Sequence, residues 1–96
     1  MKRAATVPVE IAHLGTDGVL HGHSLTIEAW TAADVCLDEW HKSLAKVAAT
    51  IEGRLETTIG GRTFEDVATN VMKALPGCCE VVIRLPTKGH IVRLVA

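Results

Sequence analysis

The sequence has few aromatic residues. It contains two Trp, one Phe and no Tyr among 96 residues, although 48% of its residues are hydrophobic. The core of this chain must therefore be built mainly from Val, Leu, Ile and Ala. A chain of this length is expected to form one small domain, residues 1–96, with a thin core. Because so short a chain carries so much apolar sequence, we expect part of it to be buried in a homo-oligomer.

Neither sign of charge is in excess. Ten Lys and Arg stand against eleven Asp and Glu, which gives a net charge of −1. Basic surfaces attract nucleic acid and anionic membranes, so we expect neither as a partner. No stretch approaches the roughly 20 apolar residues that cross a bilayer. Met1-Lys2-Arg3 is not followed by the apolar core of a secretory signal, so we expect a cytoplasmic protein.

The sequence has too few cysteines for a disulfide framework. There are three, Cys36, Cys78 and Cys79. Their number is odd and two of them are adjacent, which is not the spacing of a set of bridges. Adjacent cysteines also lack the two-residue gap of a thiolate zinc site. We expect all three to be reduced and buried as small apolar side chains.

Alternating apolar and polar residues predict four strands. They are expected at residues 5–14, 20–31, 80–85 and 91–95. Residues 15–18 have the composition of a turn, and residues 86–89 that of a hairpin turn. Pro8, inside the first strand, indicates an edge or irregular position, because proline cannot donate a ladder hydrogen bond.

Two helices are expected between the two pairs of strands. The first is capped by Asp34 or Thr31 and ends near Gly53, and the second is capped by Thr63 and ends before Pro76-Gly77. The apolar stripe of the first helix consists of Val35, Leu37, Trp40, Leu44, Val47, Ala48 and Ile51. The order β-β-α-α-β-β predicts an α+β fold, an antiparallel four-stranded sheet with both helices on one face.

Three histidines form the strongest candidate site. His21 and His23 flank Gly22 near the start of the second strand, and residues two apart on a strand share a face. His13 ends the first strand, so antiparallel pairing would bring three imidazoles together. Three protein ligands with a vacant fourth position are typical of a catalytic zinc. The alternative is that these are polar residues near a strand start with no ligand.

The residues around these histidines resemble a known family. The matching stretches are Ala12-His13, Leu20-His21-Gly22-His23-Ser24 and Thr63-Phe64-Glu65-Asp66-Val67-Ala68. They resemble, in order, the motifs of the 6-pyruvoyltetrahydropterin synthase family, which includes the bacterial 6-carboxytetrahydropterin synthases of queuosine biosynthesis. The last stretch is similar to the family's Thr-x-Glu-Asn-hydrophobic-Ala pattern. The resemblance covers nearly the whole chain. It implies a tunnelling fold, in which trimeric barrels stack into hexamers with active sites at subunit interfaces.

The resemblance also implies a metal site and a substrate class. It implies zinc held by His13, His21 and His23, which in the family binds the oxygen-bearing side chain of a dihydropterin triphosphate. A Lewis acid there eases proton abstraction from the adjacent carbon, and the implied activity is that of a carbon–oxygen lyase. Thr63 and Glu65 match the motif that contributes to pterin binding. Glu65 would also complement the dipole at the start of its helix.

The sequence departs from the family at its acid–base residues. Where the family has a cysteine, four positions before the first histidine of the pair, this chain has Asp17. The family's Asp-His pair before Leu-Asn corresponds to Glu52-Gly53, before Leu55-Glu56. Asp17 is therefore a candidate base, or else a turn residue, and Glu52 keeps a carboxylate. The family's late glutamate, which grips the pterin ring, has no counterpart near Leu85-Pro86-Thr87.

Three hypotheses follow. The first is a zinc-dependent enzyme that acts on a pterin-type, dihydroneopterin triphosphate-like substrate with altered catalytic residues. The second is a catalytically inactive zinc-binding homologue that serves as a binding or assembly module. The third is a small α+β domain whose histidines bind nothing. His41, on the first helix, and His90, after the last turn, are expected at the surface and have no assigned role.

Overall fold

The computed structural model describes residues 1–14, 18–53, 55–57 and 63–96; within these ranges, the side chains at positions 13, 14, 20, 21, 55–57 and 63 are not described. The described part contains five strands and two helices. They are β1 (Arg3–Leu14), β2 (Leu20–Thr31), α1 (Leu37–Ala49), β3 (Leu55–Thr57), α2 (Thr63–Ala74), β4 (Cys78–Leu85) and β5 (His90–Val95).

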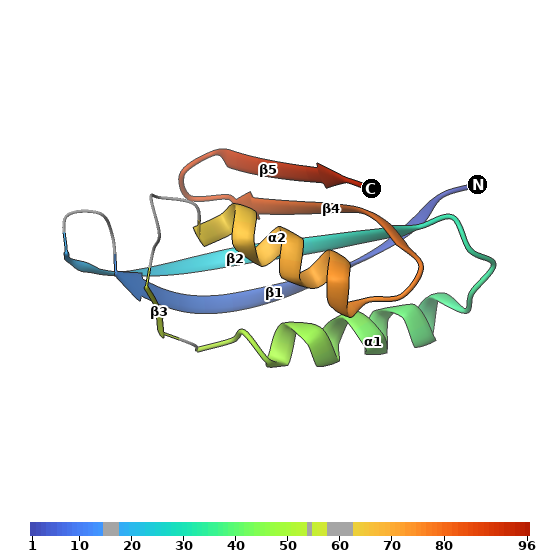
Figure 1. Ribbon diagram of the computed structural model, residues 1–96, viewed down its shortest axis with the longest axis horizontal. Helices are drawn as coiled ribbons and strands as arrows, with labels where there is room; N and C mark the ends of the chain where they lie inside the picture. The colour runs from blue at the N-terminus through green and yellow to red at the C-terminus, as the bar shows by residue number, and fades with distance from the viewer. Residues whose placement is uncertain (15–17, 54, 58–62) are drawn as a thin grey trace.

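The strands form one sheet in the order β3-β1-β2-β4-β5. β1 and β2, each 12 residues long, make an extended antiparallel hairpin that dominates the length of the molecule (Figure 1). β4 pairs antiparallel with β2, and β5 pairs antiparallel with β4. The expected antiparallel four-stranded sheet is therefore confirmed. Its α+β class is confirmed with it, because two helices accompany the sheet.

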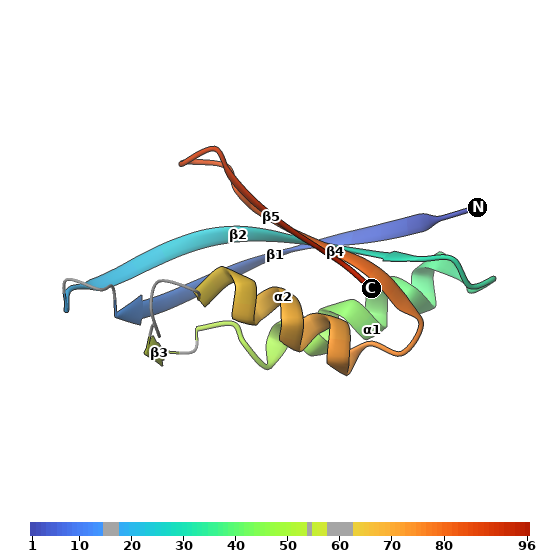
Figure 2. The same cartoon turned by 45° about the horizontal axis from the view of Figure 1, so that its top comes forward.

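Both helices pack on the same face of the sheet (Figure 2). The core between the two layers is almost wholly aliphatic, as the scarcity of aromatic residues requires. Its buried members are Val7, Val9, Ile11, Leu25, Ile27, Ala29, Trp40, Leu44, Ala48, Ile51, Val67, Ala68, Val71, Leu75, Val81, Ile83 and Leu85. Trp40 is the one aromatic residue among them, and its Nε1 donates a hydrogen bond to the Ala29 carbonyl oxygen at 3.0 Å. In the described part of the chain, neither helix is long and apolar enough to span a membrane.

The start of α1 differs from the prediction. The helix begins at Leu37 with Cys36 as its N-cap, and no side chain makes a capping hydrogen bond there. Asp34 and Thr31, the expected caps, therefore lie before the helix. Leu37 and Cys36 are exposed, contrary to the predicted burial. The buried side of α1 begins only at Trp40, one turn into the helix.

Thr31 cannot cap α1 because its hydroxyl is used elsewhere. Its side chain is fully buried. Its Oγ1 donates to the Gly77 carbonyl oxygen at 3.0 Å and accepts from the Ala33 backbone N–H at 3.1 Å. The hydroxyl thus holds the end of β2 to the turn between α2 and β4. A short polar side chain often competes for backbone groups in this way.

The other helix ends agree better with the sequence. α1 ends at Ala49 with Thr50 as its C-cap, and Gly53 follows in a turn with φ of 68°. α2 begins at Thr63, the expected cap, within the usual uncertainty of one residue. It ends at Ala74, before Pro76-Gly77 as predicted.

β3 is the element that the sequence did not predict. It pairs parallel with the last three residues of β1, Ala12 to Leu14. Among the described strands, β1 therefore has no neighbour on that side at Pro8, which confirms the edge position inferred from proline. A strand of only three residues is too short to show alternation.

Candidate functional site

The three histidines lie at the turn end of the β1–β2 hairpin. The register pairs His13 with His21 and Ile11 with His23. Directly opposed positions on antiparallel strands lie about 4.5–5.5 Å apart at Cα and share a face, and positions two apart on a strand do so as well. All three histidine positions therefore belong to the face of Ile11, whose side chain is buried beneath the helices.

Of the three histidines, His23 has a described side chain, whereas the side chains of His13 and His21 are outside the described residues. His23 is half-buried. Its ring lies 5.3 Å, between centroids, from the ring of Phe64, and the two planes are nearly perpendicular at 85°. Phe64 is the second residue of α2. The start of α2 therefore lies against the histidine end of the hairpin, and both can be seen at the same end of the molecule (Figure 1).

This contact brings the predicted substrate-binding segment to the histidines. Thr63 and Glu65 flank Phe64 at the start of α2. Glu65 is exposed, and with Asp66 it puts negative charge in the first turn, where the helix dipole favours it. The side chain of Thr63 lies outside the described residues. The contact of this segment with His23 is shown, whereas its role in binding a ligand stays a prediction.

The two predicted catalytic carboxylates have different outcomes. Asp17 lies outside the described residues. Glu52 is exposed, in the turn that follows α1. The next residue, Gly53, donates its backbone N–H to the Glu10 carbonyl oxygen at 2.7 Å. Glu10 is opposite Ser24, the neighbour of His23 on β2, and three positions before His13 on β1, so the backbone after Glu52 is close to the level of His23 but not to that of His13 and His21.

Glu56 is a residue that the sequence reasoning missed. The parallel pairing of β3 with β1 puts Glu56 directly beside His13, on the side opposite His21. A row across three strands therefore reads Glu56, His13, His21. The side chain of Glu56 is outside the described residues. The sequence did contain an indication of Glu56. It stands at the position that corresponds to the Asn of the family's Leu-Asn, where this chain has a carboxylate.

The three histidines are a donor set of the kind that binds zinc. Imidazole nitrogens bind zinc at about 2.0–2.1 Å, and two histidines opposed across neighbouring strands can reach one ion. Imidazole donors favour zinc and similar transition metals over magnesium or calcium. Among the side chains that the structure describes, no three His, Cys, Asp or Glu are grouped to hold a metal ion. His13 and His21 are not in that set, so their convergence stays a prediction.

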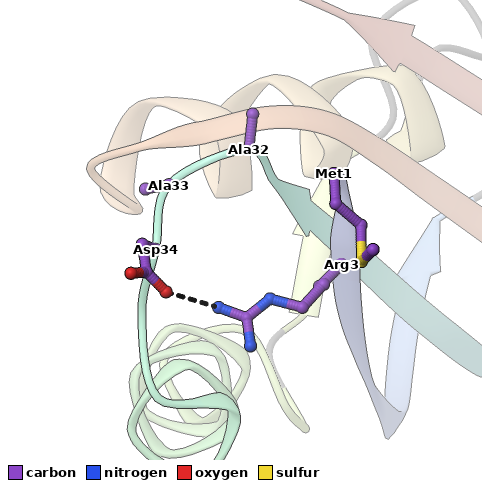
Figure 3. Close-up of a pocket in the computed structure, with 5 residues that line it drawn as sticks. All are labelled: Met1, Arg3, Ala32, Ala33 and Asp34. Atoms are coloured by element: carbon purple, nitrogen blue, oxygen red, sulfur yellow. Dashed lines mark ion pairs between the residues drawn. The ribbon is translucent and has the colours of Figure 1, made fainter.

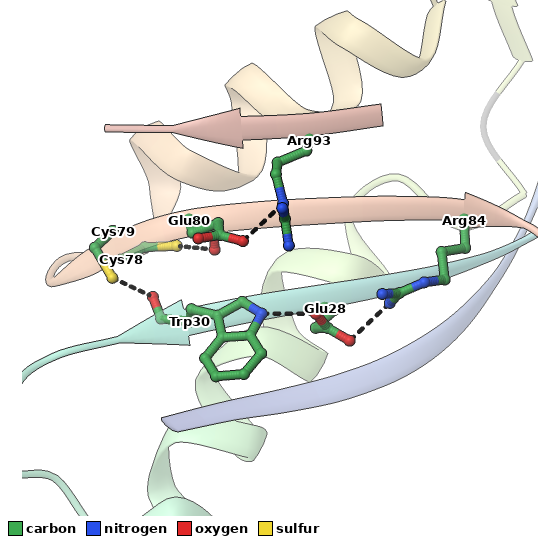
Figure 4. A network of polar contacts seen from close by, with 7 residues as sticks. All are labelled: Glu28, Trp30, Cys78, Cys79, Glu80, Arg84 and Arg93. Carbon is green, nitrogen blue, oxygen red and sulfur yellow. Dashed lines mark hydrogen bonds and ion pairs between the residues drawn. The ribbon is translucent and has the colours of Figure 1, made fainter. Parts of the chain in front are cut away.

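The cysteines lie away from the histidines. Cys78 and Cys79 begin β4, which meets β2 at Thr31, the end of that strand far from His21. Their thiols are half-buried, and each donates to a backbone carbonyl at 3.5 Å, that of Glu80 and that of Trp30 (Figure 4). Burial raises the pKa of the Cys78 thiol above its ordinary value. Neither thiol is therefore placed to bind a metal with the histidines.

The helix-free face of the sheet carries a polar network (Figure 4). Glu28 accepts hydrogen bonds from Trp30 Nε1 at 2.6 Å and from Arg84 Nη1 at 2.7 Å. On the neighbouring strands, Glu80 Oε2 and Arg93 Nε are 2.9 Å apart. Each carboxylate is paired with a guanidinium, so the network is balanced in charge. It fits a role in holding strands together rather than in binding an ion.

The two pockets described in the structure do not include the histidines. One is lined by Met1, Arg3, Ala32, Ala33 and Asp34, beside the N-terminal end of β1 (Figure 3). There the Arg3 guanidinium donates to the Val35 carbonyl oxygen and lies 3.8 Å from an Asp34 carboxylate oxygen. The other lies between the start of α1 and the end of α2, and Val35, Trp40, Leu75 and Pro76 form its apolar part. Neither groups residues suited to catalysis. His41 and His90 are exposed, as expected.

No protein-family model matches the chain, and no curated protein matches it. The family resemblance therefore rests on the motifs themselves and on their place in the fold. The structure puts the His13 and His21–His23 motifs on paired strands, with the start of the Thr63–Ala68 motif packed against them.

Proposed function

We propose that the chain is a zinc-binding protein of the 6-pyruvoyltetrahydropterin synthase type that acts on a pterin-type substrate in the cytoplasm. The observation that carries this proposal is the β1–β2 register, which opposes His13 to His21 and keeps His23 on their face. The packing of Phe64 on His23 supports it, because it brings the Thr63–Glu65 segment to the same place.

In this proposal the three histidines hold the metal and leave one position open for a substrate oxygen. Bound zinc would polarise that oxygen and make the neighbouring carbon easier to deprotonate. Thr63 and Glu65 would bind polar groups of the pterin from the start of α2. A carboxylate near the histidines would take the proton, if it is within hydrogen-bond reach.

Three carboxylates are candidates for that base: Asp17, Glu52 and Glu56. Of the two whose backbone is described, Glu56 is in the row of His13 and His21, whereas Glu52 precedes a backbone contact to Glu10, one position from the row of His23. Glu56 is therefore level with two of the proposed ligands and Glu52 is close to the level of the third. Asp17 is still a candidate for the base because it stands four residues before His21 in the sequence, where the family has its cysteine.

The family arrangement also supplies the assembly that we propose, a homo-oligomer of three or six chains. In the family, active sites lie at subunit interfaces. A neighbouring subunit would then contribute to the site at the turn end of the β1–β2 hairpin. Of this chain's other described elements, the start of α2 and β3 meet the hairpin there.

Metal analysis tests the first part of the proposal. Purified protein reconstituted with zinc and desalted is expected to hold about one zinc ion per chain, measured by elemental analysis. His21→Ala removes one of three ligands, so it should lose most of the bound zinc. His41→Ala, an exposed histidine on α1, is the matched control and should keep it. Wild-type protein without zinc, or His21→Ala with a full complement, would contradict the proposal.

Turnover tests the second part. Zinc-loaded protein is incubated with dihydroneopterin triphosphate, and the pterins are separated by chromatography. We expect the substrate to be consumed, and Asp17→Asn, Glu52→Gln and Glu56→Gln show which carboxylate is needed. The absence of the family's cysteine and histidine favours the alternative, an inactive zinc-binding homologue. One zinc per chain with no consumption of substrate would support that alternative.

A further inference from the structure

The contact between Phe64 and His23 joins two elements that are far apart in the sequence. His23 is on β2, and Phe64 is on α2. Their rings meet edge to face, at 5.3 Å and 85°. Perpendicular aromatic pairs at this separation are favourable by about 0.5–1.5 kcal/mol beyond the area that they bury. The contact is therefore strong enough to bias the orientation of an imidazole ring.

Phe64 is itself held in place. It packs against the buried core cluster. Val67 and Ala68, on the next turn of α2, are fully or almost fully buried. A phenyl ring that is fixed on one side by the core can restrict the orientation of an imidazole ring that packs on its other side. His23 is half-buried and packs against the Phe64 ring, whereas the neighbouring Gly22 is exposed.

Ring orientation matters for a histidine that binds metal. The ligating nitrogen carries its lone pair in the plane of the ring, so the ring must turn its edge to the ion. Neighbours that fix this orientation tune metal affinity, and the apolar surroundings of a site control the access of water. The family pattern leaves the residue between Thr63 and Glu65 open, so a phenylalanine there is a property of this chain.

We propose that Phe64 is a positioning residue, which orients the imidazole of His23 for metal binding and couples the start of α2 to the metal site. This inference rests on the proposed function, because it assumes that His23 is a ligand. It predicts that loss of the aromatic ring weakens metal binding through His23 while the other two histidines are unchanged.

The test measures zinc affinity by competition with a chromophoric chelator. Phe64→Leu is expected to weaken zinc binding about 2- to 10-fold, the factor that corresponds to the pair energy. Met72→Leu is the matched control. Met72 is also half-buried on α2 against the core, and a swap between Met and Leu nearly conserves volume. It should leave zinc affinity unchanged.

A double-mutant cycle separates positioning from a merely structural effect. In a His23→Ala background, zinc is bound more weakly by the two remaining histidines and is titrated directly at higher zinc concentration. There, Phe64→Leu should no longer change zinc affinity, because the ring that it orients is gone. An equal loss in both backgrounds would overturn the inference, and so would an unchanged affinity of Phe64→Leu. If Phe64→Leu does not fold, as judged by circular dichroism, Phe64→Met gives the same comparison. Wild-type protein that binds no zinc would overturn the proposed function as well, which distinguishes the two failures.

Discussion

At the scale of single residues, Glu28 is a carboxylate whose pKa departs from its ordinary value. Its side chain is 15% exposed. Burial alone would raise its pKa, but hydrogen bonds from Trp30 and Arg84 and the charges of Arg84 and Arg93 outweigh burial, and the pKa is lowered below 4.5. A carboxyl group whose pKa is lower in the folded state than in the unfolded state stabilises the fold above its unfolded pKa. That contribution is lost as the pH falls through the folded pKa.

Glu28→Gln should therefore destabilise the protein in a pH-dependent way. At pH 7 we expect a loss of about 1 kcal/mol in the free energy of unfolding, because hydrogen bonds to a charged acceptor are lost or weakened. Arg84 is 41% exposed, so solvent screens its charge and keeps the loss small. The difference from wild type should shrink as the pH falls from the ordinary range of a glutamate through the lowered pKa of Glu28 in the folded protein, because the carboxylate then becomes protonated. Urea unfolding at several pH values measures this difference.

Glu39→Gln is the control for this prediction. Glu39 is exposed on α1, and its ion pair with Lys42 is long, at 3.9 Å. Exposed pairs of this kind contribute little, so stability should change little at any pH. A Glu28→Gln difference that is as large at pH 3 as at pH 7 would show that its charge is not the cause.

At the scale of elements, Thr31 joins two connections. It ends β2, and its hydroxyl binds the turn after α2 as well as the chain that leads to α1. Thr31→Val keeps the shape of the side chain but leaves the Gly77 carbonyl and the Ala33 N–H without this partner. Because Ala33 and Gly77 are exposed, water can reach the groups that are left, and the loss is that of two ordinary hydrogen bonds. We expect about 1–2 kcal/mol in chemical unfolding, since a typical hydrogen bond contributes about 0.5–1.5 kcal/mol. Thr6→Val, at an exposed position of β1, should change stability by less than 0.5 kcal/mol. Equal effects of the two substitutions would contradict this role of Thr31.

Elements with many residues were predictable, and short ones were not. The 12 residues of β2 alternate clearly, and its predicted bounds, Leu20 to Thr31, agree with the structure. β3 has three residues, and its pairing depends on where the chain after α1 returns to the sheet. The start of α1 at Leu37 also differs from the prediction, and the hydroxyl of Thr31, one of the two expected caps, makes a tertiary contact that local capping rules do not include.

The candidate site shows the same division. The two histidine segments were predicted to lie on paired antiparallel strands, and the register confirms this pairing, with His13 opposite His21. The convergence of the three imidazoles stays a prediction. The Phe64 contact was not predictable, because periodicity gives the buried side of α2 but not the strand residue that its first turn meets. Glu56 was missed for the reason that β3 was missed.

At the scale of the whole molecule, the sheet is longer than the helices that cover it. A strand of 12 residues spans about 40 Å, whereas helices of 13 and 12 residues span about 20 Å and 18 Å. The molecule accordingly measures 44 × 23 × 21 Å. Among the described residues, the elements that meet the histidine end of the hairpin are the start of α2 and the short β3. This shape is consistent with a site completed by a neighbouring subunit.

The edge strand β5 gives the proposed assembly a direct test. β5 ends the sheet, and its Ile91 and Val95 are 63% and 57% exposed. An open sheet edge with apolar side chains can pair with another chain, and a lysine on such an edge opposes that pairing. We expect the wild type to have a mass of three or six times 10.3 kDa by light scattering after gel filtration. Ile91→Lys should lower it to that of a monomer.

The matched control for this substitution is Leu37→Lys. Leu37 is also an exposed apolar residue, at 41%, but it lies on α1 and not on the sheet edge. The same added charge there should leave the mass unchanged. A wild type of 10.3 kDa in solution would contradict the assembly. If Leu37→Lys dissociated the oligomer while Ile91→Lys did not, the helical layer would be the interface. In that case, β5 would have to be protected from pairing by its short length of six residues and by the exposed charge of Arg93.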